Sequence, residues 1–186
     1  MNNEIIIVSG LPRSGTSLMM QMLDAGGIEA MTDKLRTPDN SNPQGYFEYE
    51  PVKKLASDNS WVKNACGKSV KVIAQLLQYL PDDFQYKVIF MERNLDEVLR
   101  SQQVMLGKGN TPAPVAIGEV FKKQLVNVQA WMENKPNVSY IKAVYSHIVA
   151  DPSSFITELE SFLGRPLDRE KMTQAVNPSL YRNKVG

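Results

Sequence analysis

Apolar residues recur along the chain in short blocks that alternate between strand-like and helix-like spacing. The run Ile5-Ile6-Ile7-Val8 contains only β-branched residues, which indicates a strand buried on both faces of a parallel sheet. Helical spacing follows in residues 17–25, where apolar side chains lie three or four positions apart until Gly26. The N-terminal segment therefore predicts a strand, a glycine-rich turn and a helix in direct succession.

The same alternation continues through the rest of the chain. Three further strands are predicted, at residues 69–74, 87–91 and 138–141. Helices are predicted at residues 51–64, in a short segment ending near Leu80, at 95–106 after the cap residue Asn94, at 116–133, and at 151–164. Residues 32–48 are rich in Asp, Asn, Pro and Gly and predict a long loop with turns at Asn42-Pro43 and Gln44-Gly45. Repeated β then α predicts an α/β fold of three layers, with a central parallel sheet flanked by helices.

Composition is that of an ordinary globular chain. Of 186 residues, 42% are hydrophobic and 22% charged, and no repeat or linker divides them, so we expect one domain over residues 1–186. Lys and Arg number 21 against 20 Asp and Glu, which argues against nucleic acid or a membrane surface as a partner.

Cysteine and histidine are almost absent from the chain. Cys66 and His147 are the only ones of their types, which excludes an intramolecular disulfide and argues against a zinc site. The apolar run at residues 5–8 is too short for a secretory leader or a membrane span. We therefore expect a cytoplasmic protein.

The turn after the first strand reads Gly-Leu-Pro-Arg-Ser-Gly-Thr-Ser over residues 10–17. Two glycines at this spacing allow successive backbone N–H groups to converge on phosphate oxygens at the start of a helix, where the helix dipole also favours an anion. The alternative is a purely structural turn, which would need the same glycines. The flanking strand and helix favour a phosphate-binding P-loop.

This loop departs from the loop of ATPases in the position of its positive charge. Thr16 occupies the place of the usual lysine, and the cation comes earlier, at Arg13. The strand at residues 87–91 runs into Glu92-Arg93 and offers no Asp of the kind that holds Mg²⁺. Metal-dependent hydrolysis of a nucleoside triphosphate is therefore disfavoured, and we expect no metal.

Residues 12–17 resemble the sulfate-binding loop, close to P-[KR]-S-G-T-[TS], of sulfotransferases that use 3′-phosphoadenosine 5′-phosphosulfate (PAPS). These enzymes, cytosolic and bacterial, belong to the P-loop superfamily. The resemblance implies that Arg13 contacts the 5′-phosphate and the sulfonate in transfer. It also implies that the nucleotide is cradled by Pro12, Arg13, Ser14, Gly15, Thr16 and Ser17.

Two more segments are similar to the same family. Arg93 and Ser101 match an Arg and a helical Ser eight residues apart that hold the 3′-phosphate, and Tyr145 matches a tyrosine that touches adenine. A nucleotide with phosphates at both its 3′ and 5′ positions needs two anion sites, and an arginine can clamp the second with charge-assisted hydrogen bonds. Taken alone, Arg93 would equally suit a helix cap or a surface ion pair.

Several family features are missing. Many animal members have a catalytic histidine in a Lys-x-His segment, where this chain has Lys71-Val72-Ile73. Leu18 replaces the aromatic residue that stacks on adenine. A basic, glycine-containing C-terminal element has only a faint counterpart in Arg182, Lys184 and Gly186. The usual catalytic base is therefore absent.

Two other residues are candidates for catalysis beside Arg13. Glu48 lies in the segment Asn-Pro-Gln-Gly-Tyr-Phe-Glu, similar to one beside the active site of several bacterial sulfotransferase-like proteins, and could accept the acceptor's proton. A solvated carboxylate is the alternative. Lys71 could neutralise the leaving phosphate, or could be a lysine at the edge of the core. We favour a structural or surface role for His147.

The sequence thus predicts an enzyme that transfers a sulfonate group from PAPS to a hydroxyl or amine of a small acceptor, leaving 3′,5′-adenosine bisphosphate. A non-catalytic nucleotide-binding or regulatory domain is the first alternative, since Ile73 and Leu18 depart from the family. A kinase for a small metabolite is the second, and Thr16 argues against it. The loops at 32–50 and 107–115, where we expect acceptor contacts, do not identify the acceptor, and nothing indicates an oligomeric state.

Overall fold

Four parallel strands form the centre of the structure, a computed structural model that describes residues 3–33, 35–39, 42, 45–109 and 111–182. The strands are β1 (Glu4–Gly10), β2 (Ser69–Lys71), β3 (Gln85–Glu92) and β4 (Val138–Val144), in the order β2-β1-β3-β4. β1 and β3 pair in register, with Ile7 opposite Val88. The predicted parallel sheet is confirmed.

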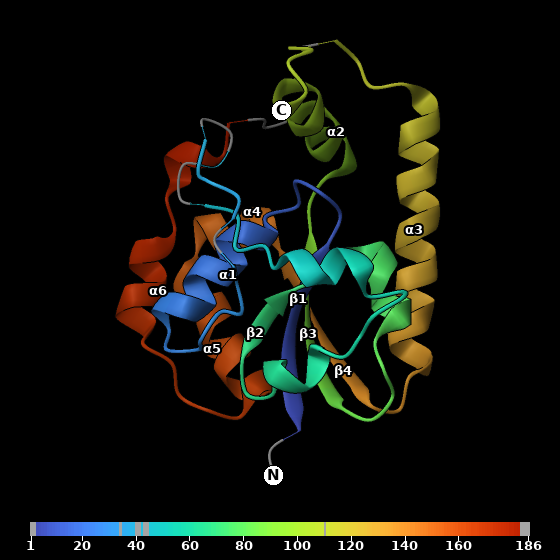
Figure 1. The fold of residues 1–186 in the computed structure, drawn as a ribbon. Coiled ribbons are helices and arrows are strands. Elements are labelled where there is room, and N and C mark those ends of the chain that lie inside the picture. The colour runs from blue at the N-terminus through green and yellow to red at the C-terminus, as the bar shows by residue number, and fades with distance from the viewer. Residues whose placement is uncertain (1–2, 34, 40–41, 43–44, 110, 183–186) are drawn as a thin grey trace.

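Helices cover both faces of this sheet (Figure 1). One face is covered by α1 (Thr16–Ala25), α4 (Tyr145–Ala150), α5 (Pro152–Leu163) and α6 (Arg169–Ala175). The other is covered by α3 (Val115–Asn134) and three 3-10 helices, η1 (Glu50–Lys54), η2 (Val62–Ala65) and η3 (Ala74–Tyr79). Side chains alternate along a strand, so Ile6 packs in one layer and Ile7 in the other, both buried. The three-layer α/β fold is therefore as predicted.

The helix ends follow the sequence signals closely. The Asn94 side chain accepts hydrogen bonds from the backbone N–H groups of Asp96 and Glu97 and so begins α2 (Leu95–Met105). Asp151 caps α5 in the same way, and Gly164 ends that helix with φ of 70°. The cap at Asn94 begins α2 at the carboxyl edge of the sheet, where the glycine-rich loop also lies (Figure 1).

The structure differs from the prediction at several elements. The helix predicted at 51–64 is wrong: η1 and η2 are separated by polar residues, where Asp58 Oδ1 accepts from the N–H of Ser60 instead of a helix continuing. The strand predicted at 69–74 ends at Lys71, and η3 begins at Ala74. The short helices α4 and α6 were not predicted; α6 is held by buried Met172, which packs on Gly26.

Some predicted features lie outside the described residues, namely Pro43 and Gln44 of the predicted turns and Lys184 and Gly186 of the C-terminal element. A last short 3-10 helix, η4 (Pro178–Leu180), precedes the end of the described chain. Within the described ranges, no helix has both the length and the apolar character needed to cross a bilayer.

Candidate functional site

The glycine-rich loop connects the end of β1 to the first turn of α1. A Cβ atom on Gly10 would lie 2.5 Å from Ser14 Oγ, and one on Gly15 would lie 2.4 Å from Tyr145 Cδ2. Only glycine fits at these two positions, because the loop packs directly on neighbouring atoms. Arg13 also has a positive φ, 69°, which is uncommon for a residue with a side chain and is found where the surroundings hold the backbone.

The N-terminus of α1 is open toward an anion. Its cap residue is Gly15, which has no side chain to accept hydrogen bonds from the first N–H groups of the helix. The first N–H groups of a helix have no partner within the helix, and the dipole adds partial positive charge there. Ser14 lies below this end: its N–H donates to the Leu11 carbonyl at 3.2 Å, and its hydroxyl is buried without a partner among the described residues.

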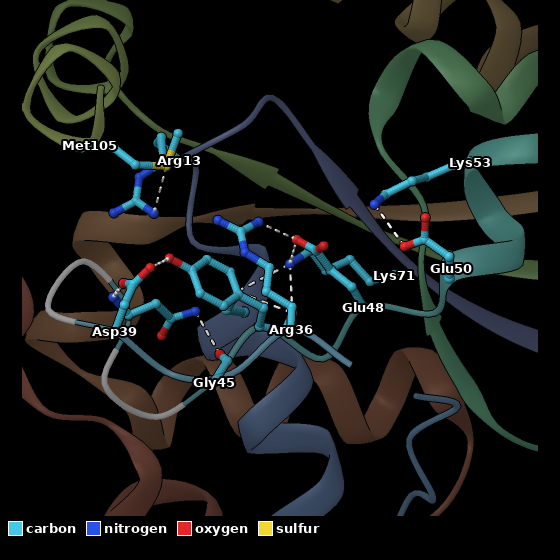
Figure 2. A network of polar contacts seen from close by, with 12 residues as sticks. Arg13, Arg36, Asp39, Gly45, Glu48, Glu50, Lys53, Lys71 and Met105 are labelled. Carbon is cyan, nitrogen blue, oxygen red and sulfur yellow. Dashed lines mark hydrogen bonds and ion pairs between the residues drawn. The ribbon is translucent and has the colours of Figure 1, made fainter. Parts of the chain in front are cut away.

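Arg13 reaches from the loop to α2. Its Nε donates to Ser101 Oγ at 3.1 Å, and its Nη1 lies 3.8 Å from Met105 Sδ (Figure 2). Burial lowers the pKa of Arg13, with an opposing effect of Tyr46 and a further lowering by Arg93. The guanidinium nevertheless stays charged, because arginine is not deprotonated in proteins. The loop therefore presents a partly buried cation beside Ser101.

Arg93 lies at the end of β3 and is almost fully buried. Its Nε pairs with Glu97 Oε2 at 2.9 Å, with 8% and 5% of the two side chains exposed. Its Nη1 donates to the Arg13 carbonyl at 3.2 Å, so it contacts the loop backbone directly. Sequence reasoning left open a surface ion pair for Arg93; the structure shows an ion pair that is buried, with Arg93 also beside the loop.

Two tyrosines enclose this arginine. The Arg93 guanidinium carbon lies 4.6 Å from the centre of the Tyr145 ring and 5.2 Å from that of Tyr181. The rings pack edge to face at 5.0 Å, and the Tyr181 hydroxyl donates to Glu97 Oε1 at 2.8 Å. Burial raises the pKa of both tyrosines. Tyr181 thus brings the C-terminal segment onto the site.

Lys71, at the end of β2, joins the long loop to the start of α1. Its Nζ donates to the Tyr46 carbonyl at 2.7 Å and to Ser17 Oγ at 3.2 Å, and lies 3.8 Å from Glu48 Oε1 (Figure 2). Burial lowers the pKa of Lys71 to about 8, while Glu48 opposes that shift. The ammonium is therefore engaged by protein atoms on several sides.

Glu48 lies between two cations. Arg36 Nη1 contacts its Oε1 at 2.8 Å, and the same guanidinium stacks on the Tyr46 ring, 3.4 Å from the ring centre (Figure 2). The Tyr46 hydroxyl donates to Asp39 Oδ2 at 2.7 Å. These contacts, together with that of Lys71, which also bonds Ser17 at the start of α1, hold the Glu48 carboxylate near the glycine-rich loop.

Most of these groups border one cavity of about 520 Å³, whereas Ser14, Asp39, Glu97 and Tyr181 lie outside its lining. Of the described residues that line it, five are basic, Arg13, Arg36, Lys71, Arg93 and Arg182, and one is acidic, Glu48. The predicted site residues that line it are Pro12, Arg13, Gly15, Thr16, Ser17, Glu48, Lys71, Arg93, Ser101 and Tyr145. A cavity of this size and charge suits a polyanionic ligand with a second, smaller molecule.

Sequence reasoning missed four residues of this site. Glu97 and Tyr181 organise Arg93, and Arg36 and Tyr46 organise Glu48. The four-residue spacing of Arg93 and Glu97 was the available signal, but spacing alone does not show that the pair is buried. Ile73 and Leu18 line the cavity where the resemblance led us to look for a histidine and an aromatic ring, whereas His147 is exposed on α4.

A family model and several solved structures both relate the chain to sulfotransferases. A family model described as the sulfotransferase domain matches residues 3–184. No curated protein sequence matches the chain. Among solved structures, the sulfotransferase domain of the Synechococcus PCC 7002 olefin synthase is similar with a TM-score of 0.60 and 18% identity, covering 96% of this chain and 86% of that one.

Two other solved structures are also similar. A sulfotransferase from Mycobacterium tuberculosis H37Rv has a TM-score of 0.55 and 14% identity, over 95% of this chain and 71% of that one. A mouse sulfotransferase complexed with PAP has a TM-score of 0.52 and 14% identity, over 98% of this chain and 65% of that one. These likenesses show a shared α/β P-loop-like fold.

Proposed function

The chain belongs to the sulfotransferase domain family, and we propose that it transfers a sulfonate group from PAPS to a hydroxyl or amine of a small acceptor. Sulfonyl transfer is the activity of the family. PAPS as the donor is supported by the charge of the cavity, and the similar mouse enzyme was solved with PAP.

The observation that carries this proposal is the meeting of two basic sites in one cavity. The glycine-rich loop offers the open end of α1 with Arg13, and the β3–α2 connection offers Arg93 and Ser101. Arg93 Nη1 on the Arg13 carbonyl fixes the two sites relative to each other. A nucleotide with separate 3′ and 5′ phosphates needs two such anion sites, whereas a nucleoside triphosphate needs only one extended site.

In this assignment the nucleotide lies across the loop. The N–H groups of the first turn of α1, together with Thr16, Ser17 and Arg13, would hold the 5′-phosphate end. Arg93 and Ser101 would hold the 3′-phosphate, and Tyr145 would contact adenine. The fit is supported by the excess of basic over acidic side chains in the cavity wall.

PAPS supplies a sulfonate already activated by attachment to a phosphate. The acceptor oxygen or nitrogen forms a bond to sulfur as the bond from sulfur to the phosphate oxygen breaks, and the acceptor loses a proton. Arg13 and the α1 N-terminus stabilise the negative charge that grows on the leaving phosphate. Holding both molecules in one cavity aligns the reacting atoms and removes much of the entropic barrier.

Glu48 is the proposed base that receives the acceptor's proton. Its carboxylate is positioned by Arg36 and Lys71, and the Lys71 ammonium also binds Ser17 at the start of α1. Lys71 therefore connects the base to the phosphate-binding helix and adds positive charge near the leaving phosphate. Arg13, Glu48 and Lys71 are the proposed catalytic group.

The donor assignment is tested by titrating the purified protein with 3′,5′-adenosine bisphosphate, AMP and ATP·Mg²⁺. We expect the bisphosphate to bind most tightly, because it alone occupies both anion sites. Tighter binding of ATP·Mg²⁺, or equal binding of bisphosphate and AMP, would refute the assignment. Release of sulfonate from PAPS then separates an enzyme from a domain that only binds the nucleotide.

A further inference from the structure

The thioether of Met105 faces the cation of the glycine-rich loop. Met105 is the last residue of α2, and its Sδ lies 3.8 Å from Arg13 Nη1 (Figure 2). It also lines the cavity proposed for the nucleotide. A thioether is only a weak hydrogen-bond acceptor, so in this state it restrains the guanidinium little.

Met105 also differs from most methionines of the chain in its exposure. Six described methionines are buried in the core, namely Met19, Met20, Met22, Met91, Met132 and Met172. Met31 and Met105 are the two described methionines that are partly exposed. Met31 packs against the core cluster under α3 and does not line the cavity, which makes it a matched control. An oxidant in solution therefore reaches few sulfur atoms, and one of them lies beside Arg13.

We propose that Met105 is an oxidation site that controls nucleotide binding, an inference that rests on the proposed function. A hydroperoxide transfers one oxygen atom to the Met105 sulfur. The peroxide O–O bond breaks, a sulfur–oxygen bond forms, and the other oxygen leaves as water, or as an alcohol from an organic hydroperoxide. Sulfur is oxidised by two electrons and the peroxide is reduced by two.

The sulfoxide changes the environment of Arg13. Its oxygen is a much better acceptor than the thioether sulfur, and Arg13 Nη1 is the donor within reach. Arg13 Nε is already bonded to Ser101 on the same helix, so the new bond would fix the guanidinium on α2 through two groups. The guanidinium is then less available to the 5′-phosphate end of the nucleotide. Methionine sulfoxide reductases reverse the change, with one enzyme for each sulfur epimer.

The test compares the wild-type chain with Met105→Leu and Met31→Leu, each before and after limited hydrogen peroxide. Peptide mass spectrometry locates the added oxygen, and titration with 3′,5′-adenosine bisphosphate measures affinity. In wild type and Met31→Leu we expect oxidation at Met105 and a loss of affinity of about tenfold, the effect of one hydrogen bond to a charged group. Met105→Leu should keep its own untreated affinity, and treatment with both reductases should restore the wild type.

Three results would overturn the inference. In the first, peroxide oxidises Met31 while Met105 stays reduced. In the second, Met105 is oxidised but the affinity for the bisphosphate does not change. In the third, peroxide lowers the affinity of Met105→Leu as much as that of the wild type. Failure of the proposed function gives a different result, because the untreated wild-type chain would then show no preference for the bisphosphate over AMP.

Discussion

Replacement of Arg93 tests the proposed 3′-phosphate site. The structure shows that Glu97 must be replaced with it, so that no unpaired carboxylate remains buried. Arg93 and Glu97 form a buried pair, with 8% and 5% of their side chains exposed. Removing only the arginine leaves a buried carboxylate with the Tyr181 hydroxyl still bound, and breaking a buried ion pair costs about 3–5 kcal/mol of stability. We therefore combine Arg93→Met with Glu97→Gln, so that the double variant buries no charge; Glu97→Gln alone keeps the Arg93 cation and is the reference for ligand binding, not for stability.

The expected magnitude follows from the bonds that Arg93 would make. A hydrogen bond to a charged group contributes about 1.5–3 kcal/mol, so Glu97→Gln/Arg93→Met should bind the bisphosphate about ten to a hundred times more weakly than Glu97→Gln. AMP has no 3′-phosphate, so its affinity should change much less than that of the bisphosphate.

Isothermal titration of both variants with both ligands, with unfolding curves to confirm that both are folded, measures this difference. Equal losses for the bisphosphate and AMP would show that Arg93 acts only through its hydrogen bond to the Arg13 carbonyl. That result would refute a direct role of Arg93 at the 3′-phosphate.

Three more predictions concern the base, the lysine and the loop. Glu48→Gln should lower turnover by about 10²–10⁴ while bisphosphate affinity, measured by titration, stays the same; unchanged turnover would exclude Glu48 as the base. Burial holds the pKa of Lys71 at about 8, below about 10.4 for a free lysine. Between these pH values unfolded Lys71 binds more protons than folded Lys71, so the free energy of unfolding of wild type should rise with pH by up to about 3 kcal/mol relative to that of Lys71→Met; parallel pH curves would contradict this. Gly15→Ala should abolish bisphosphate binding and destabilise the chain more than Gly27→Ala, since both have positive φ but only at Gly15 does a Cβ meet another side chain; equal unfolding midpoints would show that the loop accommodates the methyl group.

Local signals in the sequence predicted most of the fold. The β-branched run at residues 5–8 and the caps Asn94 and Asp151 define their elements through interactions within a few residues, so a single sequence is enough to locate them. The prediction was wrong at 51–64, because the turn in which Asp58 Oδ1 accepts from the N–H of Ser60 separates η1 from η2, and each packs its own apolar residues into the core.

The residues of the candidate site also fall into two groups, those that local spacing identifies and those whose role depends on tertiary contacts. Arg13 and the glycines could be found from spacing, because a phosphate loop is built by consecutive residues. Glu97, Arg36 and Tyr181 could not be assigned a role, since their partners lie on other elements or their importance depends on burial. The charge state of Lys71 is likewise a property of its surroundings, as desolvation lowers its pKa.

By itself, the sequence determined the α/β alternation, the phosphate loop and the identity of the residues proposed to bind the nucleotide. Only the tertiary structure decided that Arg13 lies against Ser101 and Met105, that Arg93 is enclosed by two tyrosines, and that Glu48 lies between two cations. The physical reason is the range of the interactions. Backbone preferences and caps act within one turn of chain, whereas ion pairs, ring contacts and desolvation join residues that only the packed sheet and helices bring together.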